Sequence, residues 1–265
     1  MNILDQIISQ KRKEVEERKS LYPVKLLEKS IYFSSPSVSL KKYLLRDDLT
    51  GVIAEIKRKS PSKGAINSYV NIERTSIGYM QAGASALSVL TDTGFFGGKN
   101  EDLTLARKFN YCPILRKDFI IDEYQIVEAK SIGADAVLLL ANVLDKARIK
   151  ELAVFARSLG LETVLEIREA EELGSLNENI DCAGINNRNL KDFKVNVDQS
   201  FVLGQRIPRE FVKISESGIS DPDVLLKLKA QGFRGFLIGE FFMKHSRPEL
   251  ACATFIHQVN SRIQR

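Results

Sequence analysis

The stretch from Gly51 to Gly64 reads GVIAEIKRKSPSKG and begins with an apolar run that is typical of a buried strand. Side chains alternate between the two faces of a strand, so Ile53, Glu55 and Lys57 share one face. The loop that follows, RKSPSKG, lacks the GxGxxG pattern that a dinucleotide-binding, doubly wound sheet carries after its first strand. Because a (β/α)8 barrel uses the same alternation of strands and helices without that pattern, the stretch favours the barrel.

Further apolar runs follow, and each ends in polar residues before a segment of helical periodicity. They are ALSVLTD from Ala86, CPILRKDF from Cys112, AVLLLA from Ala136, ETVLEI from Glu162, CAGINNR from Cys182, FVKISESG from Phe211 and GFLIGEFF from Gly235. The motifs AGAS, IGAD, SLG and QGF precede several of these runs and place a glycine where a helix would end. The pattern predicts an α/β fold in which residues 1–265 form a single (β/α)8 TIM barrel domain.

Residues 1–50 precede the first barrel strand and carry helical signals of their own. The segment ILDQIISQKRKEVEERK is an amphipathic helix pattern, and VKLLEKS and VSLKKYLL follow it. No low-complexity linker separates them from the rest of the chain. We therefore expect an N-terminal helical extension that packs on the barrel rather than a second domain.

Composition limits the partners of the chain. Its formal net charge is +5, but basic and acidic residues are interleaved, which favours anionic small molecules over nucleic acid. The three cysteines are far apart and form no CxxC pair, so neither a disulfide framework nor a zinc site is indicated. The N-terminus lacks the apolar core of a signal peptide, and no window is long enough to span a membrane. We expect a cytoplasmic protein that does not bind membranes.

Polar side chains gather where the candidate strands end, which is the end of a TIM barrel that holds active sites. They are Glu55, Lys57, Lys117, Glu166, Asn186, Arg188 and the run Ser215–Gly218. Alternation places Lys117 on the same face as Leu115 and Phe119, and it turns Arg116 and Asp118 to the other face. Charged residues at the ends of four or more strands must each lose water there, which packing alone does not explain. Surface charge remains the simpler interpretation of Lys59 and Lys63, and a structural role stays open for Asn186 and Arg188.

Two loops have the glycine spacing of a phosphate site. ESGIS follows the seventh strand and IGEFF the eighth, the two positions at which TIM barrels commonly bind phosphate. The backbone amides of Gly218, Gly239 and Glu240 are the predicted donors.

Side-chain chemistry narrows the mechanism. His245 and His257 lie beyond the last strand, so proton transfer falls to lysine and glutamate. Two inward lysines would lower each other's proton affinity, and a glutamate partner would counter this for one of them. We expect neither a metal ion nor a cofactor.

The segments EIKRKSPSKG, LTDTGFFGG, LRKDFIIDEYQI, LEI, GINNRNL, SESGI and IGEFFM resemble, in this order, those of indole-3-glycerol phosphate synthases. The resemblance covers nearly the whole chain, including the N-terminal extension. It implies a (β/α)8 barrel that closes the pyrrole ring of indole in tryptophan biosynthesis. The implied substrate is a small phosphosugar, 1-(2-carboxyphenylamino)-1-deoxyribulose 5-phosphate, which loses carbon dioxide and water.

The same resemblance implies roles for individual residues. Lys117 would be the general acid and Glu166 the second acid/base, with Lys57, Glu55 and Asn186 completing the catalytic group. Substrate-binding residues would be Ser60, Phe95, Phe119, Arg188 and Ser217, with Phe95 and Phe119 walling the anthranilate ring. Phosphate would be bound by Lys57, Gly218, Gly239 and Glu240.

Several alternatives remain at this point. A Schiff-base aldolase could use Lys117 or Lys57 as a nucleophile, and a barrel that only binds phosphosugars would need no acid or base. Arg168, Phe241 and Phe242 depart from residues that are frequent in the family. For assembly we expect a monomer, and association with other enzymes of tryptophan biosynthesis is left open.

Overall fold

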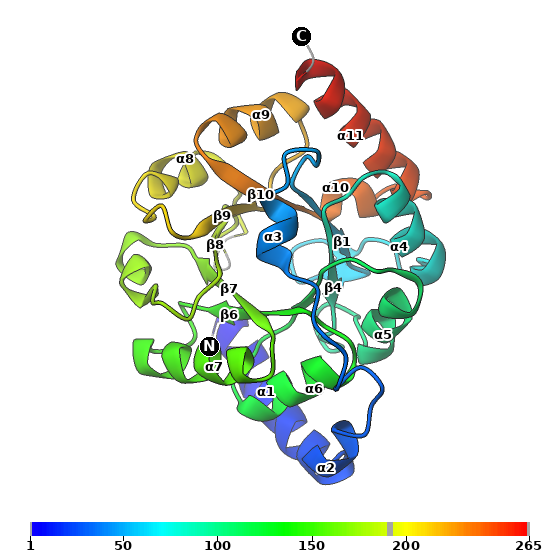
Figure 1. Ribbon diagram of the computed structural model, residues 1–265, viewed down its shortest axis with the longest axis vertical. Coiled ribbons are helices and arrows are strands. Elements are labelled where there is room, and N and C mark those ends of the chain that lie inside the picture. The colour runs from blue at the N-terminus through cyan, green and yellow to red at the C-terminus, as the bar shows by residue number, and fades with distance from the viewer. Residues whose placement is uncertain (1, 190–192, 264–265) are drawn as a thin grey trace.

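The computed structural model describes residues 2–189 and 193–263. Within these residues, parallel strands close into a barrel in the order β1-β10-β9-β8-β7-β6-β5-β4 (Figure 1). They are β1 (Val52–Ile56), β4 (Ala86–Leu90), β5 (Ile114–Lys117), β6 (Ala136–Leu140), β7 (Glu162–Ile167), β8 (Cys182–Asn186), β9 (Val212–Glu216) and β10 (Phe233–Ile238). This confirms the predicted (β/α)8 TIM barrel.

Helices surround the strands (Figure 1). They are α4 (Ile72–Gln81), α5 (Asn100–Phe109), α6 (Glu123–Ser131), α7 (Lys146–Ser158), the 3₁₀ helix η1 (Ala170–Ser175), α8 (Asp198–Gly204), α9 (Pro222–Ala230), α10 (Glu240–Met243) and α11 (Pro248–Ile263). A small antiparallel pair, β2 (Lys59–Ser60) and β3 (Gly64–Ala65), lies in the segment between β1 and α4. Among the described helices, none has the length and apolar character needed to cross a bilayer.

The strand β6 shows why these sequences form a barrel. Its five residues, AVLLL, are all buried, as expected for a parallel strand covered on both faces. Ala136, Leu138 and Leu140 pack in the cluster inside the barrel. Val137 and Leu139 pack in the outer cluster, against the helices. Burial of each leucine side chain contributes about 2 kcal/mol, so a two-residue period of apolar side chains fixes which face points inward.

Glycines end several helices as the sequence indicated. Gly83, Gly133, Gly160 and Gly232 all have positive φ, between 73° and 93°. This left-handed conformation is unfavourable for residues with a Cβ atom, and it lets the chain reverse from a helix into the next strand.

The N-terminal segment forms the expected helices α1 (Ile3–Leu21), α2 (Val24–Leu27) and α3 (Leu40–Leu44). In Figure 1, α3 lies in front of the strands and α1 behind them. Leu40 and Leu44 of α3 join the cluster inside the barrel. Lys11 of α1 is buried, and its Nζ lies 2.9 Å from Asp92 Oδ2 and 3.0 Å from Asp118 Oδ1, beyond the ends of β4 and β5. The extension is therefore attached to the barrel by apolar contacts and by a buried ion-pair cluster.

The run GFLIGEFF marks the last strand and the loop after it. β10 spans Phe233–Ile238, so it begins two residues before this run, and Glu240–Met243 is helical, within the IGEFF segment that was expected to follow the strand. The change occurs at Gly239, where a Cβ atom would lie 2.2 Å from Glu55 Oε1. A residue larger than glycine cannot pass this carboxylate, and the chain turns away into α10 directly after it.

Candidate functional site

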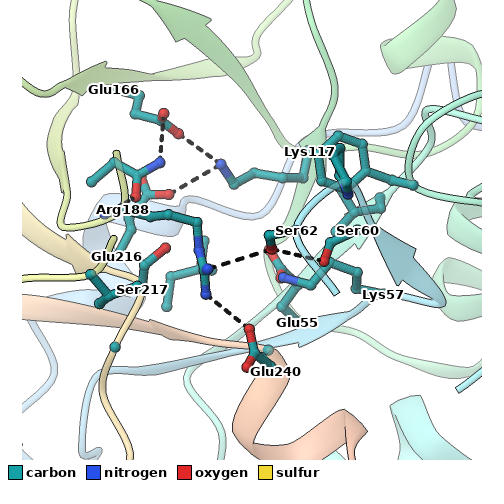
Figure 2. Close-up of a pocket in the computed structure, with 18 of the residues that line it drawn as sticks. Glu55, Lys57, Ser60, Ser62, Lys117, Glu166, Arg188, Glu216, Ser217 and Glu240 are labelled. Atoms are coloured by element: carbon teal, nitrogen blue, oxygen red, sulfur yellow. Dashed lines mark hydrogen bonds and ion pairs between the residues drawn. The ribbon is translucent and has the colours of Figure 1, made fainter. Parts of the chain in front are cut away.

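A cavity of about 370 Å³ lies at the ends of the barrel strands, the position expected for a TIM barrel site (Figure 2). Its lining includes Glu55, Lys57, Ser60, Lys117, Phe119, Glu166, Asn186, Arg188, Ser217, Gly218, Gly239 and Glu240. The structure thus brings together every predicted site residue except Phe95. The lining combines charged side chains with apolar ones.

Lys117, the last residue of β5, lies between two carboxylates (Figure 2). Its Nζ is 2.8 Å from Glu166 Oε2 and 3.1 Å from Glu216 Oε2. Burial disfavours the charged ammonium, but the carboxylates of Glu166, Glu216 and Glu55 outweigh burial and raise the pKa of Lys117 above its ordinary value. Lys117 is therefore a protonated group held in a low-dielectric site, so carboxylates determine its charge rather than a neighbouring lysine.

Glu166 ends the inward face of β7 and is held at both of its oxygens. Oε2 pairs with Lys117, and Oε1 accepts a hydrogen bond of 2.9 Å from Asn186 Nδ2. Burial alone would raise the pKa of Glu166, but Lys117 and the Asn186 amide stabilise the anion and lower it. Asn186 is thus a donor that keeps Glu166 ionised.

Glu216, predicted at the end of the seventh strand, is a second carboxylate that pairs with Lys117. Burial raises its pKa to about 7 against the opposing influence of Lys117, and the charge of Glu166 adds to the rise. Its Oε1 atom is buried and has no hydrogen-bond partner among the described residues. Alternation could have identified it, because Glu216 lies two residues after Ile214, which packs inside the barrel.

Glu55 and Lys57 form an ion pair at the edge of the cavity. Lys57 Nζ lies 2.6 Å from Glu55 Oε1, and the Glu55 side chain is buried. Both residues share a face with Ile53, which packs inside the barrel, so the alternation predicted for this stretch is confirmed. Lys57 is left with 17% of its side chain exposed, which makes it a cation that a ligand can reach.

The aromatic wall differs from the expectation by one residue. Phe119 and Phe96 line the cavity, with ring centroids 6.0 Å apart, whereas Phe95 is not among the lining residues. Asp92 Oδ1 accepts hydrogen bonds from the backbone amides of both Phe95 and Phe96, which fixes this turn after β4. Side chains from α1 and β6 complete the apolar wall. They are Ile3, Leu4, Ile7, Leu138 and Leu140.

Arg188 reaches across the mouth of the cavity. Its Nη2 lies 2.8 Å from Glu240 Oε2, and its Nη1 lies 3.5 Å from Ser62 Oγ (Figure 2). The backbone N–H of Arg188 donates to Asn186 Oδ1 at 2.9 Å, so Asn186 links this arginine to Glu166. Leu190 of the GINNRNL segment lies outside the described residues.

Arg116 and Asp118, which were predicted to point away from the cavity, are held by contacts with other elements. Arg116 donates to Glu128, and Asp118 binds Lys11 and accepts from Thr91 at 2.6 Å. Arg116 is thus directed outward as predicted, whereas Asp118, which follows the end of β5, is among the residues that line the cavity. Across residues 2–189 and 193–263, no group of three histidine, cysteine or acidic side chains is arranged to hold a metal ion.

Comparison with known proteins assigns the chain to a family. A family model described as indole-3-glycerol phosphate synthase matches residues 4–255. The chain is 49% identical over 258 residues to indole-3-glycerol phosphate synthase of Bacteroides thetaiotaomicron, covering 97% of this chain and 99% of that protein. It is 40% identical over 251 residues to the enzyme of the same name from Salinibacter ruber, covering 94% and 93%.

Solved structures with low sequence identity share the fold. A structure of the tryptophan synthase complex from Pyrococcus furiosus matches 80% of this chain and 98% of the other, with a TM-score of 0.59 and 15% identity. The 3-hexulose-6-phosphate synthase of Salmonella typhimurium matches 79% and 99%, with a TM-score of 0.58 and 13% identity. These likenesses support the barrel alone. The family model and the close relatives go further, and the chain belongs to the indole-3-glycerol phosphate synthase family.

Proposed function

We propose that this chain converts 1-(2-carboxyphenylamino)-1-deoxyribulose 5-phosphate into indole-3-glycerol phosphate, with loss of carbon dioxide and water. Membership of the indole-3-glycerol phosphate synthase family supports this activity, which is that of a carboxy-lyase of tryptophan biosynthesis. The observation in the site that best fits it is a lysine ammonium held between two buried carboxylates beside an apolar wall. Such a site can deliver a proton to a carbonyl oxygen while an aromatic ring lies against the wall.

Ring closure requires a proton on the ribulose carbonyl as the aromatic carbon attacks it. We assign this proton to Lys117, because its carboxylate partners keep it charged at neutral pH and it lines the cavity. Loss of carbon dioxide then restores the aromatic ring. Lys117 thus protonates the carbonyl oxygen in the same step in which the carbon–carbon bond forms.

Dehydration needs a base and an acid. Glu166 is the proposed base, since Lys117 and Asn186 keep it ionised. The hydroxyl that leaves must receive a proton. Lys57 lines the cavity and can donate one, and so can Lys117 once it has regained from solvent the proton that it gave up in ring closure. Glu55 and Glu216 hold the two lysines in place through ion pairs.

Substrate recognition divides between the aromatic and the charged residues of the lining. Phe96 and Phe119 are the proposed contacts of the anthranilate ring, with Phe96 taking the role first given to Phe95. Anionic groups would meet the cations Lys57 and Arg188. We propose that the amides of Gly218, Gly239 and Glu240, with the hydroxyls of Ser60 and Ser217, bind the phosphate, because all five residues line the cavity.

Other chemistry fits the site less well. A Schiff-base aldolase needs an unprotonated lysine nucleophile, whereas the carboxylates around Lys117 favour its ammonium form. A barrel that only binds phosphosugars would have no use for two buried carboxylates on one lysine. Borohydride trapping of the protein with substrate distinguishes the aldolase, because the proposed reaction forms no covalent adduct.

The activity is tested by adding the substrate to purified protein without metal or cofactor. Indole fluorescence and release of carbon dioxide should rise together. Absence of both signals from folded protein that binds the substrate would favour the barrel that only binds.

We also propose that the chain is a cytoplasmic monomer. Cys112, Cys182 and Cys252 are all buried as free thiols, which suits a reducing compartment. Sedimentation of the purified protein tests the monomer, and a mass twice that of the chain would contradict it.

A further inference from the structure

The ion pair of Arg188 and Glu240 places a negative charge inside a site for negative ligands (Figure 2). Glu240 Oε2 lies 2.8 Å from Arg188 Nη2, and Lys63 Nζ lies 4.0 Å from Glu240 Oε1. Arg188, Glu240 and Ser62, which accepts from Arg188 at 3.5 Å, all line the cavity. One carboxylate therefore associates with two cations at the mouth of the site.

The burial of these side chains is unequal. Arg188 has 19% of its side chain exposed, Glu240 has 37% and Lys63 has 59%. Arg188 is also bound to Phe193 O at 3.4 Å, and its own backbone N–H is held by Asn186. Arg188 is thus fixed from several directions. Glu240 is the more exposed partner, and it can turn toward solvent without opening a cavity in the core.

We infer that the Glu240 carboxylate is an internal anion that occupies Arg188 and Lys63 while the site is empty and competes with a substrate anion for them. The inference rests on the proposed function, which supplies a substrate with one phosphate and one carboxylate. It concerns the side chain of Glu240, whereas the phosphate role proposed above concerns its backbone amide. Glu240 is in this sense a residue that sets affinity, not a group that takes part in the chemistry.

Electrostatics gives the direction of the effect. An incoming anion must either displace Glu240 from Arg188 or bind beside it. In both cases Glu240 weakens the net attraction between the anion and the two cations, Arg188 and Lys63. In return, Arg188 keeps a partner in the empty site and does not remain partly buried and unpaired. The bound anion is held less tightly, and release of the phosphorylated product is correspondingly faster.

Glu240→Gln tests the competition, because it removes the charge and nearly preserves the shape. Binding of inorganic phosphate, and separately of 2-aminobenzoate, is measured by titration calorimetry at constant ionic strength. We expect the dissociation constant of one probe to fall about tenfold, the size expected for loss of one nearby like charge at the edge of a protein. If inorganic phosphate is the probe that binds more tightly, Glu240 competes with the phosphate of the substrate. If 2-aminobenzoate binds more tightly, Glu240 competes with the carboxylate of the substrate.

Glu210→Gln is the matched control, since Glu210 is exposed and does not line the cavity. It should leave both dissociation constants within about twofold of the unmodified protein. Unchanged or weaker binding of both probes by folded Glu240→Gln would overturn the inference. If this variant does not fold, Glu240→Ala is titrated in its place with the same criterion.

Turnover separates this inference from the proposed function. Unmodified protein that forms indole-3-glycerol phosphate, together with a Glu240→Gln variant that binds neither probe more tightly, would refute only the competition. Absence of turnover by the unmodified protein would refute the proposed function, whichever way the titrations come out.

Discussion

Glu216 Oε2 lies 3.1 Å from Lys117 Nζ, while Glu216 Oε1 is buried without a hydrogen-bond partner among the described residues. Glu166, the other carboxylate on Lys117, has both oxygens engaged, because Asn186 donates to its Oε1. This difference in donors separates the two carboxylates. Glu166 stays ionised, and burial raises the pKa of Glu216 to about 7.

The raised pKa of Glu216 predicts a pH-dependent effect on stability. A carboxyl whose pKa is higher in the folded state stabilises the fold fully below its ordinary pKa of 4.5, and this stabilisation is lost as pH rises through about 7. Glu216→Gln removes that loss. The quantity to compare is the melting temperature of the variant minus that of the unmodified protein. We expect this difference to be a few degrees larger at pH 8 than at pH 5, which is the change that about 1 kcal/mol produces in a chain of this size. A difference that does not change with pH would contradict the raised pKa.

Asn186→Ala should move the acid limb of the pH profile of kcat/KM to higher pH. The pKa of Glu166 is lowered by Lys117 and by the Asn186 hydrogen bond, and removal of the amide weakens this effect. The base form of Glu166 would then be lost at higher pH as the solution is acidified. We also expect kcat/KM near neutrality to fall at least tenfold. A lower kcat/KM with the acid limb unmoved would mean that Asn186 acts only by holding Arg188.

Phe95 and Phe96 form a matched pair for testing the aromatic wall. Phe96→Leu removes a ring that lines the cavity and lies 6.0 Å from Phe119, so KM should rise about tenfold. Phe95→Leu changes a residue outside the lining, and KM should change less than twofold. Steady-state kinetics of the two variants checks this, and a larger effect at Phe95 would restore the original assignment.

We propose that residues 1–50 and the barrel unfold as one unit, and Lys11 tests this. Lys11→Met leaves Asp92 and Asp118 buried without their shared cation, which should cost about 3 kcal/mol or more. The exposed residue Lys13 on the same helix provides the control variant Lys13→Met, with little expected change. Urea unfolding followed by far-UV circular dichroism should show one transition, at lower urea only for Lys11→Met. Two separate transitions would indicate that the extension is independent.

Site residues on regular strands could be predicted from the sequence. Glu55, Lys57 and Lys117 were assigned to the cavity from the two-residue period of a strand, and all three line it, with Lys57 one residue after the end of β1. Alternation also predicts that Glu216 points into the barrel. It cannot predict that Glu216 pairs with Lys117, because that contact joins β5 to β9.

Beyond the strands the rule no longer applies. Phe95 and Phe96 lie in a turn whose conformation is set by the Asp92 carboxylate, so adjacent residues could not be told apart by alternation. The contacts of Lys11 with Asp92 and Asp118 join positions far apart in the chain, and no local pattern predicts such a pair. The requirement for glycine at position 239, before α10, likewise depends on the distant Glu55 carboxylate.

The most direct test of the proposed mechanism is a single-turnover measurement on Lys117→Ala. Indole fluorescence is followed after mixing with the substrate, and binding of the substrate is measured separately by titration calorimetry. We expect ring closure to slow by at least about a thousandfold while the dissociation constant changes by less than about tenfold, with the exposed Lys227→Ala as control. Near-normal formation of indole-3-glycerol phosphate by Lys117→Ala would contradict the assignment of the carbonyl proton to Lys117.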